Sequence, residues 1–150
     1  HHLGRGAQFV LPFENRAPEV GATLHHPDGQ IYAFPFVPAP QAAAARAFAG
    51  GYDLARELDR WGDPARLVTL ATAASFVPPY ARFPYECWIA PLARRAHLAD
   101  LTAAEREDLA RLLGDCCARY DRLFGRPMPY MMAFQTAPAG AEGSFHMTVQ

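Results

Sequence analysis

The sequence predicts an α+β fold, and three observations lead to that prediction. Apolar runs of strand length recur along the chain, turn residues separate them, and one long amphipathic helix stands among them. The chain has 150 residues, of which 51% are hydrophobic and 19% are charged. This composition is typical of a globular protein rather than a disordered one, and the length indicates one ordinary domain.

Six segments are expected to be strands because they are short, apolar and bounded by Pro or Gly. They are Gln8–Glu14, Gln30–Val37, Leu67–Val77, Glu86–Leu92, Tyr130–Gln135 and Phe145–Gln150. Residues 41–66 have a different character and predict a connector of two helical pieces, broken at Gly50 and Gly51. From residue 67 the expected order is therefore strand, strand, helix, strand, strand.

The long helix is expected to begin after Thr102, which can act as N-cap with Glu105 three residues later. Apolar residues then recur at steps of three and four and form one apolar face. Gly125 is expected to end the helix. Cys116 and Cys117 lie within it, and core or near-core packing is the simplest role for them.

Composition excludes several classes of chemistry. All 14 basic residues are Arg, and with 15 acidic residues the net charge is −1. We therefore expect no nucleic-acid or membrane partner and no catalytic lysine. The two serines, Ser75 and Ser144, do not lie in a nucleophile elbow. Three cysteines are an odd number for a disulfide framework, so a reducing, cytoplasmic setting is expected.

The stretch TLHHPDGQ, residues 23–30, sets two of the six histidines side by side before a Pro and a Gly. Neutral imidazole is a nucleophile near neutral pH, and Gly lets a backbone approach phosphate oxygens closely. These residue types are therefore compatible with phosphate chemistry. A plain Pro-Asp-Gly turn with solvated histidines is the alternative, and the residues by themselves favour it.

The longer string FENRAPEVGATLHHPDGQIYAFPF, residues 13–36, resembles the signature of galactose-1-phosphate uridylyltransferases, a branch of the histidine-triad superfamily. Downstream strings such as VPPYARFPYECWIAPLARRAHLADLT and MMAFQTAPAG resemble the second half of the same family. The resemblance implies a histidine-triad-like antiparallel sheet with a packed helix, as a fragment of a two-half transferase. Residues 1–40 would end the N-terminal half, 41–66 would connect, and 67–150 would form the C-terminal half.

In that family a UDP-sugar gives its uridylyl group to a histidine, and a hexose 1-phosphate then takes the group. The resemblance implies a UDP-sugar and a hexose 1-phosphate as substrates, zinc as a metal and a homodimer as the assembly. His26 matches a histidine that is a zinc ligand in many members, and Asp28 matches the nucleophilic histidine. The implied catalytic residues are Asp28, His26 and Gln30. The implied substrate-binding residues are Phe13, Glu14, Asn15, Thr23, Gly29 and Gln30.

Asp28 changes the expected chemistry because a carboxylate brings negative charge toward an anionic pyrophosphate. The repulsion is about 1 kcal/mol at about 4 Å in water and about 4 kcal/mol in a partly shielded site. Two further hypotheses therefore stand beside uridylyl transfer. The protein binds a nucleotide sugar without covalent transfer, or Asp28 acts as a general base or metal ligand that activates water or phosphate directly.

Other positions carry smaller expectations. Some family members hold a second metal at positions that match four residues of this chain, none of which is a usual metal ligand: Ala44, Gln135, Thr148 and Gln150. His146 is expected to be a surface or strand-face histidine, and His97 to lie in the loop before the long helix. Arg94 and Arg95 are expected to be solvated loop residues. Sheet packing is expected for four aromatic residues, Tyr80, Phe83, Tyr85 and Trp88.

Overall fold

The computed structural model describes residues 6–22, 28–63 and 66–150, with the side chain of Asp28 left out. One antiparallel sheet of seven strands organises these residues, in the order β2-β1-β6-β7-β5-β4-β3. The strands are β1 (Phe9–Arg16), β2 (Asp28–Phe34), β3 (Leu67–Thr69), β4 (Ala73–Phe76), β5 (Trp88–Pro91), β6 (Tyr130–Gln135) and β7 (Thr148–Val149). The predicted α+β class and the antiparallel sheet are confirmed.

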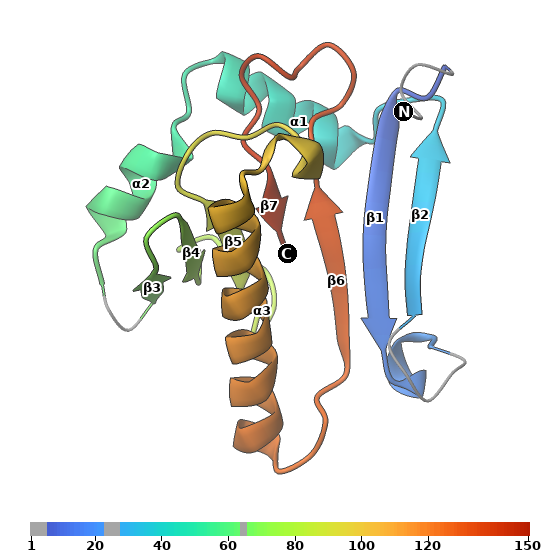
Figure 1. The fold of residues 1–150 in the computed structure, drawn as a ribbon. Coiled ribbons are helices and arrows are strands. Elements are labelled where there is room, and N and C mark those ends of the chain that lie inside the picture. The colour runs from blue at the N-terminus through green and yellow to red at the C-terminus, as the bar shows by residue number, and fades with distance from the viewer. Residues whose placement is uncertain (1–5, 23–27, 64–65) are drawn as a thin grey trace.

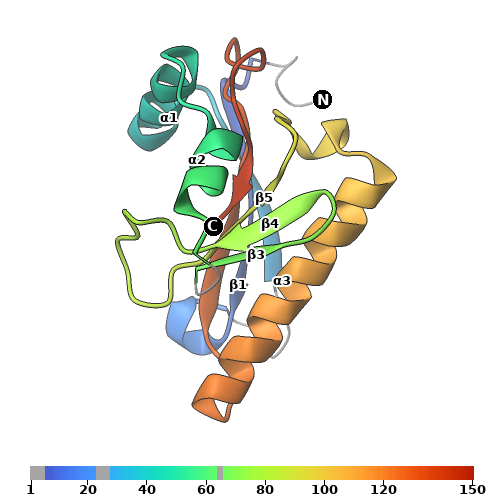
Figure 2. The same cartoon turned by 90° about the vertical axis from the view of Figure 1, so that its left-hand side faces the viewer.

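Helices cover the sheet on both sides. Figure 2 shows α3 (Ala103–Phe124) on one side, and α1 (Ala39–Ala49) and α2 (Leu54–Trp61) on the other. Short 3-10 turns at Pro18–Val20 and Leu98–Asp100 complete the fold. None of the described helices is both long enough and apolar enough to cross a membrane.

The long helix forms where the sequence predicts it. The Thr102 side chain accepts a hydrogen bond from the N–H of Glu105 at 3.2 Å, and the Glu105 carboxylate accepts one from the N–H of Thr102 at 2.7 Å. Gly125 ends the helix in the left-handed region, with φ 63°. The predicted capping box and the predicted stop are both confirmed.

The core is split between the two faces of the sheet. Under α3, the side chains of Leu109 and Leu112 pack on sheet residues such as Ile89 and Val149. On the other face, Leu54 and Leu58 of α2 pack against Ala74, Phe76 and Ala90. Both faces of the central strands are therefore buried, which explains their nearly continuous apolar runs.

The segment 67–77 is not the single strand that we predicted. It forms a hairpin of β3 and β4, so from residue 67 three strands precede α3 instead of the two expected. The N–H and hydroxyl of Thr72 both donate to the Asp108 carboxylate of α3, at 2.8 and 2.7 Å. The contact that stabilises this turn thus comes from a residue far away in the sequence.

The last predicted strand is also shorter than expected, because only Thr148–Val149 of Phe145–Gln150 is strand. The N–H of Met147 donates to the carbonyl of Arg95 at 2.8 Å, so the preceding residues bind the loop after β5. Elsewhere the helical connector, with its break at Gly50 and Gly51, and the strand Tyr130–Gln135 agree with the prediction.

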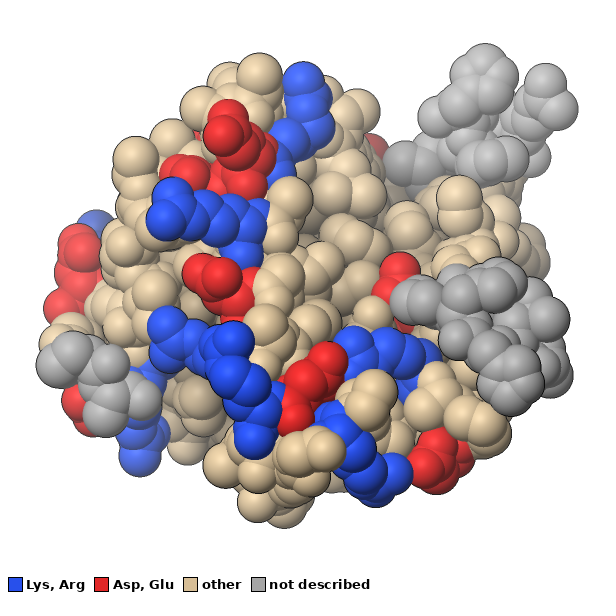
Figure 3. All heavy atoms as spheres, turned by 60° about the horizontal axis from the view of Figure 1, so that its bottom comes forward, with Lys and Arg blue, Asp and Glu red and all other residues tan. Residues whose placement is uncertain are grey.

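Charged side chains are mixed over the lower end of the molecule. Figure 3 shows Arg side chains and Asp or Glu side chains alternating on that face, without one extended patch of a single sign there. Such a mixed surface is typical of a solvated face.

Candidate functional site

Strand register brings three of the predicted substrate-binding residues to one face of the sheet. In the β1–β2 ladder Phe13 pairs with Gln30 and Asn15 pairs with Asp28. In the β1–β6 ladder Phe13 pairs with Ala133. Directly paired residues of an antiparallel ladder point to the same face, and alternate residues along one strand share it. Phe13, Asn15 and Gln30 therefore lie together on the face opposite α3.

Among the described residues, the Asn15 side chain makes one hydrogen bond and has one polar atom without a partner. Its Nδ2 donates to the carbonyl of Val20 at 3.2 Å, which ties β1 to the 3-10 turn. Its Oδ1 is buried and has no hydrogen-bond partner within the described part of the chain. A buried carbonyl oxygen without a partner is costly, so this acceptor is a natural contact for a donor group of a ligand.

Glu14 does not share this face with Phe13, Asn15 and Gln30. It pairs with Met132 in the register and points to the face that α3 covers. Its carboxylate accepts a hydrogen bond from the Tyr130 hydroxyl. Burial, followed by this contact, raises the pKa of Tyr130.

Arg16 lies on the same covered face and binds the helix. Its guanidinium forms an ion pair with Asp121 near the end of α3 and donates to the carbonyl of Met128 at 3.1 Å. The N–H of Met128 and the guanidinium of Arg16 together lower the pKa of Asp121. Glu14 and Arg16 therefore connect β1, α3 and β6.

A cavity of about 550 Å³ lies on the face that carries Phe13 and Gln30. Its wall includes side chains from α1, from β6 and from the end of the chain. The Gln41 side chain donates to that of Gln135 at 2.7 Å, and the Gln150 side chain donates to the Thr148 hydroxyl at 2.9 Å. Aromatic rings of Tyr52, Phe48, Tyr80 and Trp88 line the rest. The wall also includes Arg82 and the buried His146, so it combines neutral amides, hydroxyls and rings with one guanidinium and one imidazole.

Comparison with known proteins shows to which family this chain belongs. A family model described as galactose-1-phosphate uridyl transferase, C-terminal domain, matches residues 63–150. The chain belongs to the galactose-1-phosphate uridylyltransferase family. It is 37% identical over 145 residues to the galactose-1-phosphate uridylyltransferase of Thermotoga maritima, which covers 93% of this chain and 46% of that protein. The enzyme of the same name from Streptomyces lividans is 37% identical over 143 residues, covering 87% of this chain and 40% of the relative.

A solved structure described as a uridylyltransferase has the same fold. It superposes with a TM-score of 0.87 at 31% identity, over 99% of this chain and 49% of that chain. The chain therefore spans about half the length of the relatives that it matches. The family and the fold class that the signature implied are both confirmed.

The four positions implied for a second metal in this family do come together. Ala44, Gln135, Thr148 and Gln150 all line the 550 Å³ cavity. None of the four carries a carboxylate, imidazole or thiol, and three of them, Gln135, Thr148 and Gln150, donate or accept hydrogen bonds within the wall instead. Across residues 6–22, 28–63 and 66–150, no group of three or more His, Cys, Asp or Glu could hold a metal ion. These residues do not fit a metal.

The remaining predicted site residues lie at or beyond the edge of the described chain. Thr23 and His26 fall outside the described residues, so their predicted roles and the zinc stay predictions. Asp28 is described only by its backbone, which begins β2 opposite Asn15. Gly29 pairs with Glu14, and a Cβ there would meet the carbonyl of Phe13 at an ordinary 3.9 Å.

His146 is not the surface or strand-face histidine that we predicted. It is 3% exposed, lies before β7 and has Nε2 2.8 Å from the carbonyl of Pro91. Burial lowers the pKa of His146 below its usual value. The turn at 141–147 carries this side chain inward, and the local sequence gave no sign of that.

Two other expectations about side chains are wrong in part. Arg95 is not simply solvated, because its guanidinium forms an ion pair with the buried Glu105 at 3.0 Å. Phe83 and Tyr85 do not pack into the sheet, since they are 67% and 55% exposed. His97 lies in the loop before α3, as predicted.

Proposed function

We propose that this chain is part of a nucleotidyltransferase that moves a uridylyl group between a UDP-sugar and a hexose 1-phosphate. The observation that carries the proposal is the shared face of Phe13, Asn15 and Gln30 in a chain of this family. Gln30 would donate its amide N–H to phosphate oxygens. Asn15 would offer its Oδ1, which has no partner among the described residues, to a donor on the nucleotide, and Phe13 would give an apolar contact beside it.

Thr23 and His26 extend this proposal into the segment between the strands. Thr23 would donate its hydroxyl to a phosphate, and His26 would be one ligand of a zinc ion whose other ligands come from outside this segment. Zinc there would help to neutralise charge close to the substrate phosphates. For the whole protein we propose a homodimer, since the edge strand β2 leaves Ile31 and Tyr32 64% and 50% exposed.

Asp28 is the reason for considering a second candidate function. In uridylyl transfer through the protein, Asp28 would have to form a mixed anhydride with the uridylyl phosphorus, where the family uses histidine. That step has to overcome the repulsion between a carboxylate and an anionic pyrophosphate. The second candidate is a protein that binds a nucleotide sugar and makes no covalent intermediate.

One labelling experiment separates the candidates. The purified protein is incubated with UDP-glucose labelled in the α-phosphate, and its peptides are searched by mass spectrometry for a uridylylated residue. An adduct on residues 23–30 supports covalent transfer and rules out the binding-only protein. Transfer to galactose 1-phosphate without an adduct means direct displacement. Binding without either product supports the second candidate.

The Asp28→His variant tests whether the rest of the site is intact. Histidine at this position restores the nucleophile that the family signature has. If Phe13, Asn15 and Gln30 bind the substrate as proposed, the variant gains a phosphoramidate adduct and a higher transfer rate. A variant that binds UDP-glucose and still forms no adduct contradicts the proposed arrangement. The matched control is Asp28→Asn, which removes the charge without supplying a nucleophile.

A further inference from the structure

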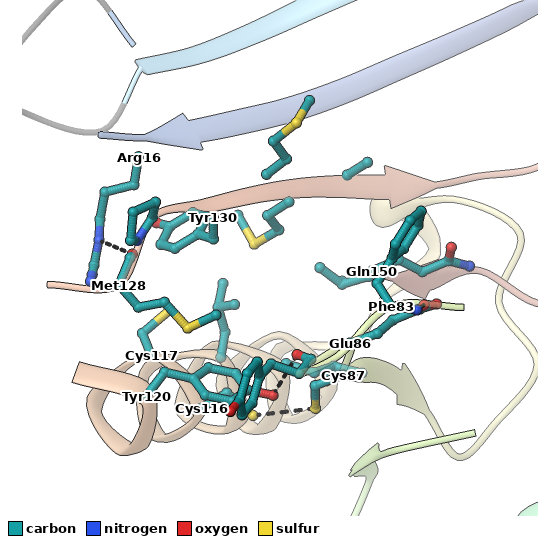
Figure 4. Close-up of a pocket in the computed structure, with 18 of the residues that line it drawn as sticks. Arg16, Phe83, Glu86, Cys87, Cys116, Cys117, Tyr120, Met128, Tyr130 and Gln150 are labelled. Carbon is teal, nitrogen blue, oxygen red and sulfur yellow. Dashed lines mark hydrogen bonds between the residues drawn. The ribbon is translucent and has the colours of Figure 1, made fainter. Parts of the chain in front are cut away.

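Two cysteines far apart in the sequence meet in the wall of a second cavity. The cavity has a volume of about 470 Å³ and lies between α3 and β6, and it shares three lining residues, Arg82, Gln135 and Gln150, with the 550 Å³ cavity. Cys87, which directly precedes β5, and Cys116, on α3, have their sulfur atoms 3.7 Å apart (Figure 4). Both are free thiols that are partly buried. An S–S bond is about 2.05 Å long, so a small rotation of the side chains separates this contact from a disulfide.

The loop that carries Cys87 is already fixed around the contact. Tyr85 has φ 64°, a left-handed conformation that is uncommon for a residue other than Gly. The Tyr120 hydroxyl of α3 donates to the carbonyl of Tyr85 at 2.8 Å. The Glu86 carboxylate accepts the N–H groups of Arg82 and Phe83, at 2.7 and 3.1 Å. These bonds hold the loop against α3 before any covalent link exists.

The surroundings of the two thiols make them chemically unequal. The pKa of Cys116 is lowered to about 7, first because the Cys87 thiol donates to it and then because Ser75 and Arg119 favour its thiolate. The same contact raises the pKa of Cys87. Burial raises the pKa of the neighbouring Cys117. Cys116 is therefore the nucleophile of the three, and the cavity gives small solutes a route to it.

We propose that Cys87 and Cys116 are a redox-active thiol pair that a peroxide converts to a disulfide. The Cys116 thiolate attacks one oxygen of the peroxide, the O–O bond breaks, and hydroxide leaves. The Cys87 sulfur then attacks the sulfenic acid sulfur, the S–S bond forms, and water leaves after the Cys87 proton is transferred. In sum, two thiols and one hydrogen peroxide give one disulfide and two waters, and the two sulfurs supply both electrons.

The disulfide would tie the 82–87 loop to α3. Arg82 and Glu86 of this loop line the 470 Å³ cavity, and Arg82 and Trp88 line the 550 Å³ cavity. Oxidation at Cys116 would therefore immobilise residues that border both cavities. Because the pair lies apart from Phe13, Asn15 and Gln30, this inference does not depend on the proposed transfer activity.

Peptide mapping tests the pair directly. The purified protein is treated with hydrogen peroxide, its remaining thiols are alkylated under denaturing conditions, and it is digested with trypsin. Cleavage after Arg places Cys87 in peptide 83–94 and Cys116 with Cys117 in peptide 112–119. We expect the two peptides to appear joined, with the mass of a disulfide, and to separate after dithiothreitol.

Three variants identify the partners. Cys87→Ser and Cys116→Ser should lose the joined peptides, whereas Cys117→Ser, the matched control on the same helix, should keep them. A joined species that persists in Cys116→Ser through Cys117 overturns the assignment. So does a disulfide within peptide 112–119, a disulfide between two molecules on a non-reducing gel, or alkylation of all three thiols after peroxide.

A second measurement, which needs no oxidant, tests whether the pKa of Cys116 is lowered by its contact with Cys87. The rate of iodoacetamide modification of Cys116, followed as mass on peptide 112–119 in Cys117→Ser, should rise with pH around a midpoint of about 7. In the double variant with Cys87→Ala the midpoint should move upward, because the donor to the thiolate is gone. A midpoint near that of an ordinary thiol in both proteins contradicts the contact.

Discussion

The two faces of the sheet along β1 use neighbouring residues of one short motif in opposite ways. Phe13 and Asn15 point to the face with the candidate site, whereas Glu14 and Arg16 point to the face that α3 covers. On the covered face both charged side chains have protein partners, in Tyr130 and in α3. On the other face the Asn15 Oδ1 atom has no partner within the described residues.

Within four consecutive residues, Glu14 and Arg16 contact other parts of the protein, whereas Phe13 and Asn15 lie on the face with the candidate site. The alternation of a strand means that every second residue of a binding motif faces away from the ligand. In this chain those residues connect β1 to α3 and β6, which holds the strand in position. A signature can therefore contain residues that connect the strand to the rest of the fold, and the contact of Glu14 with Tyr130 is a connection of this kind.

The largest effect is expected on the covered face, from Leu112→Ala. Leu112 is 1% exposed beneath α3, and removing a buried Leu side chain costs about 2–5 kcal/mol of unfolding free energy. Urea unfolding measures the loss. Leu123→Ala on the same helix is the control, since Leu123 is 63% exposed and its loss should stay within about 0.5 kcal/mol. Equal losses in the two variants would contradict the packing of α3.

The covered face is also the part that sequence reasoning predicted best. α3 could be predicted from Thr102, Glu105 and Gly125 because a capping box, a helical period and a terminal Gly are all local signals. The hairpin at Thr72 could not, since its stabilising partner is Asp108 of α3. The same limit applies to His146, whose burial depends on contacts with the distant loop after β5.

The candidate site was predictable only in part, and for a similar reason. The signature string pointed to Phe13, Asn15 and Gln30, and their shared face follows from strand alternation once the register is known. Strand alternation also separates Glu14 from them. The contact of Cys87 with Cys116 has no sequence signal, because a spacing of 29 residues becomes a contact only when α3 packs on β5.

On the other face, Gln30→Ala should weaken binding and leave stability nearly unchanged. A hydrogen bond to a charged phosphate contributes about 1.5–3 kcal/mol, so the dissociation constant for UDP-glucose should rise by about tenfold or more. Isothermal titration calorimetry measures it. Ile31→Ala is the matched control, because the next residue of β2 points the other way and is 64% exposed. An unchanged affinity in Gln30→Ala would remove Gln30 from the proposed site.

Tyr130→Phe should give the opposite result. The variant deletes the hydroxyl that donates to Glu14, and losing a hydrogen bond between partly buried groups costs about 0.5–1.5 kcal/mol of unfolding free energy. The affinity for UDP-glucose should stay within error, since Tyr130 lies on the covered face. Tyr85→Phe, at a side chain 55% exposed, controls for loss of a tyrosine hydroxyl. If Tyr130→Phe weakens UDP-glucose binding at unchanged stability, the division of roles between the faces is wrong.

The smallest effect concerns how the covered face responds to pH. Burial raises the pKa of Glu105, but the hydrogen bonds from Arg95 and Thr102 outweigh it, so the pKa lies below its usual value. A carboxyl with a lowered pKa stabilises the fold above its unfolded pKa of about 4.3, and this contribution disappears as the pH falls through the folded pKa. Glu105→Gln should therefore unfold at lower urea than the parent at pH 7, and the difference should shrink below pH about 4.

Glu107→Gln, on an exposed position of the same helix, should show little difference at either pH. A gap between Glu105→Gln and the parent that stays constant with pH would show that Glu105 contributes through its shape and hydrogen bonds rather than through its charge.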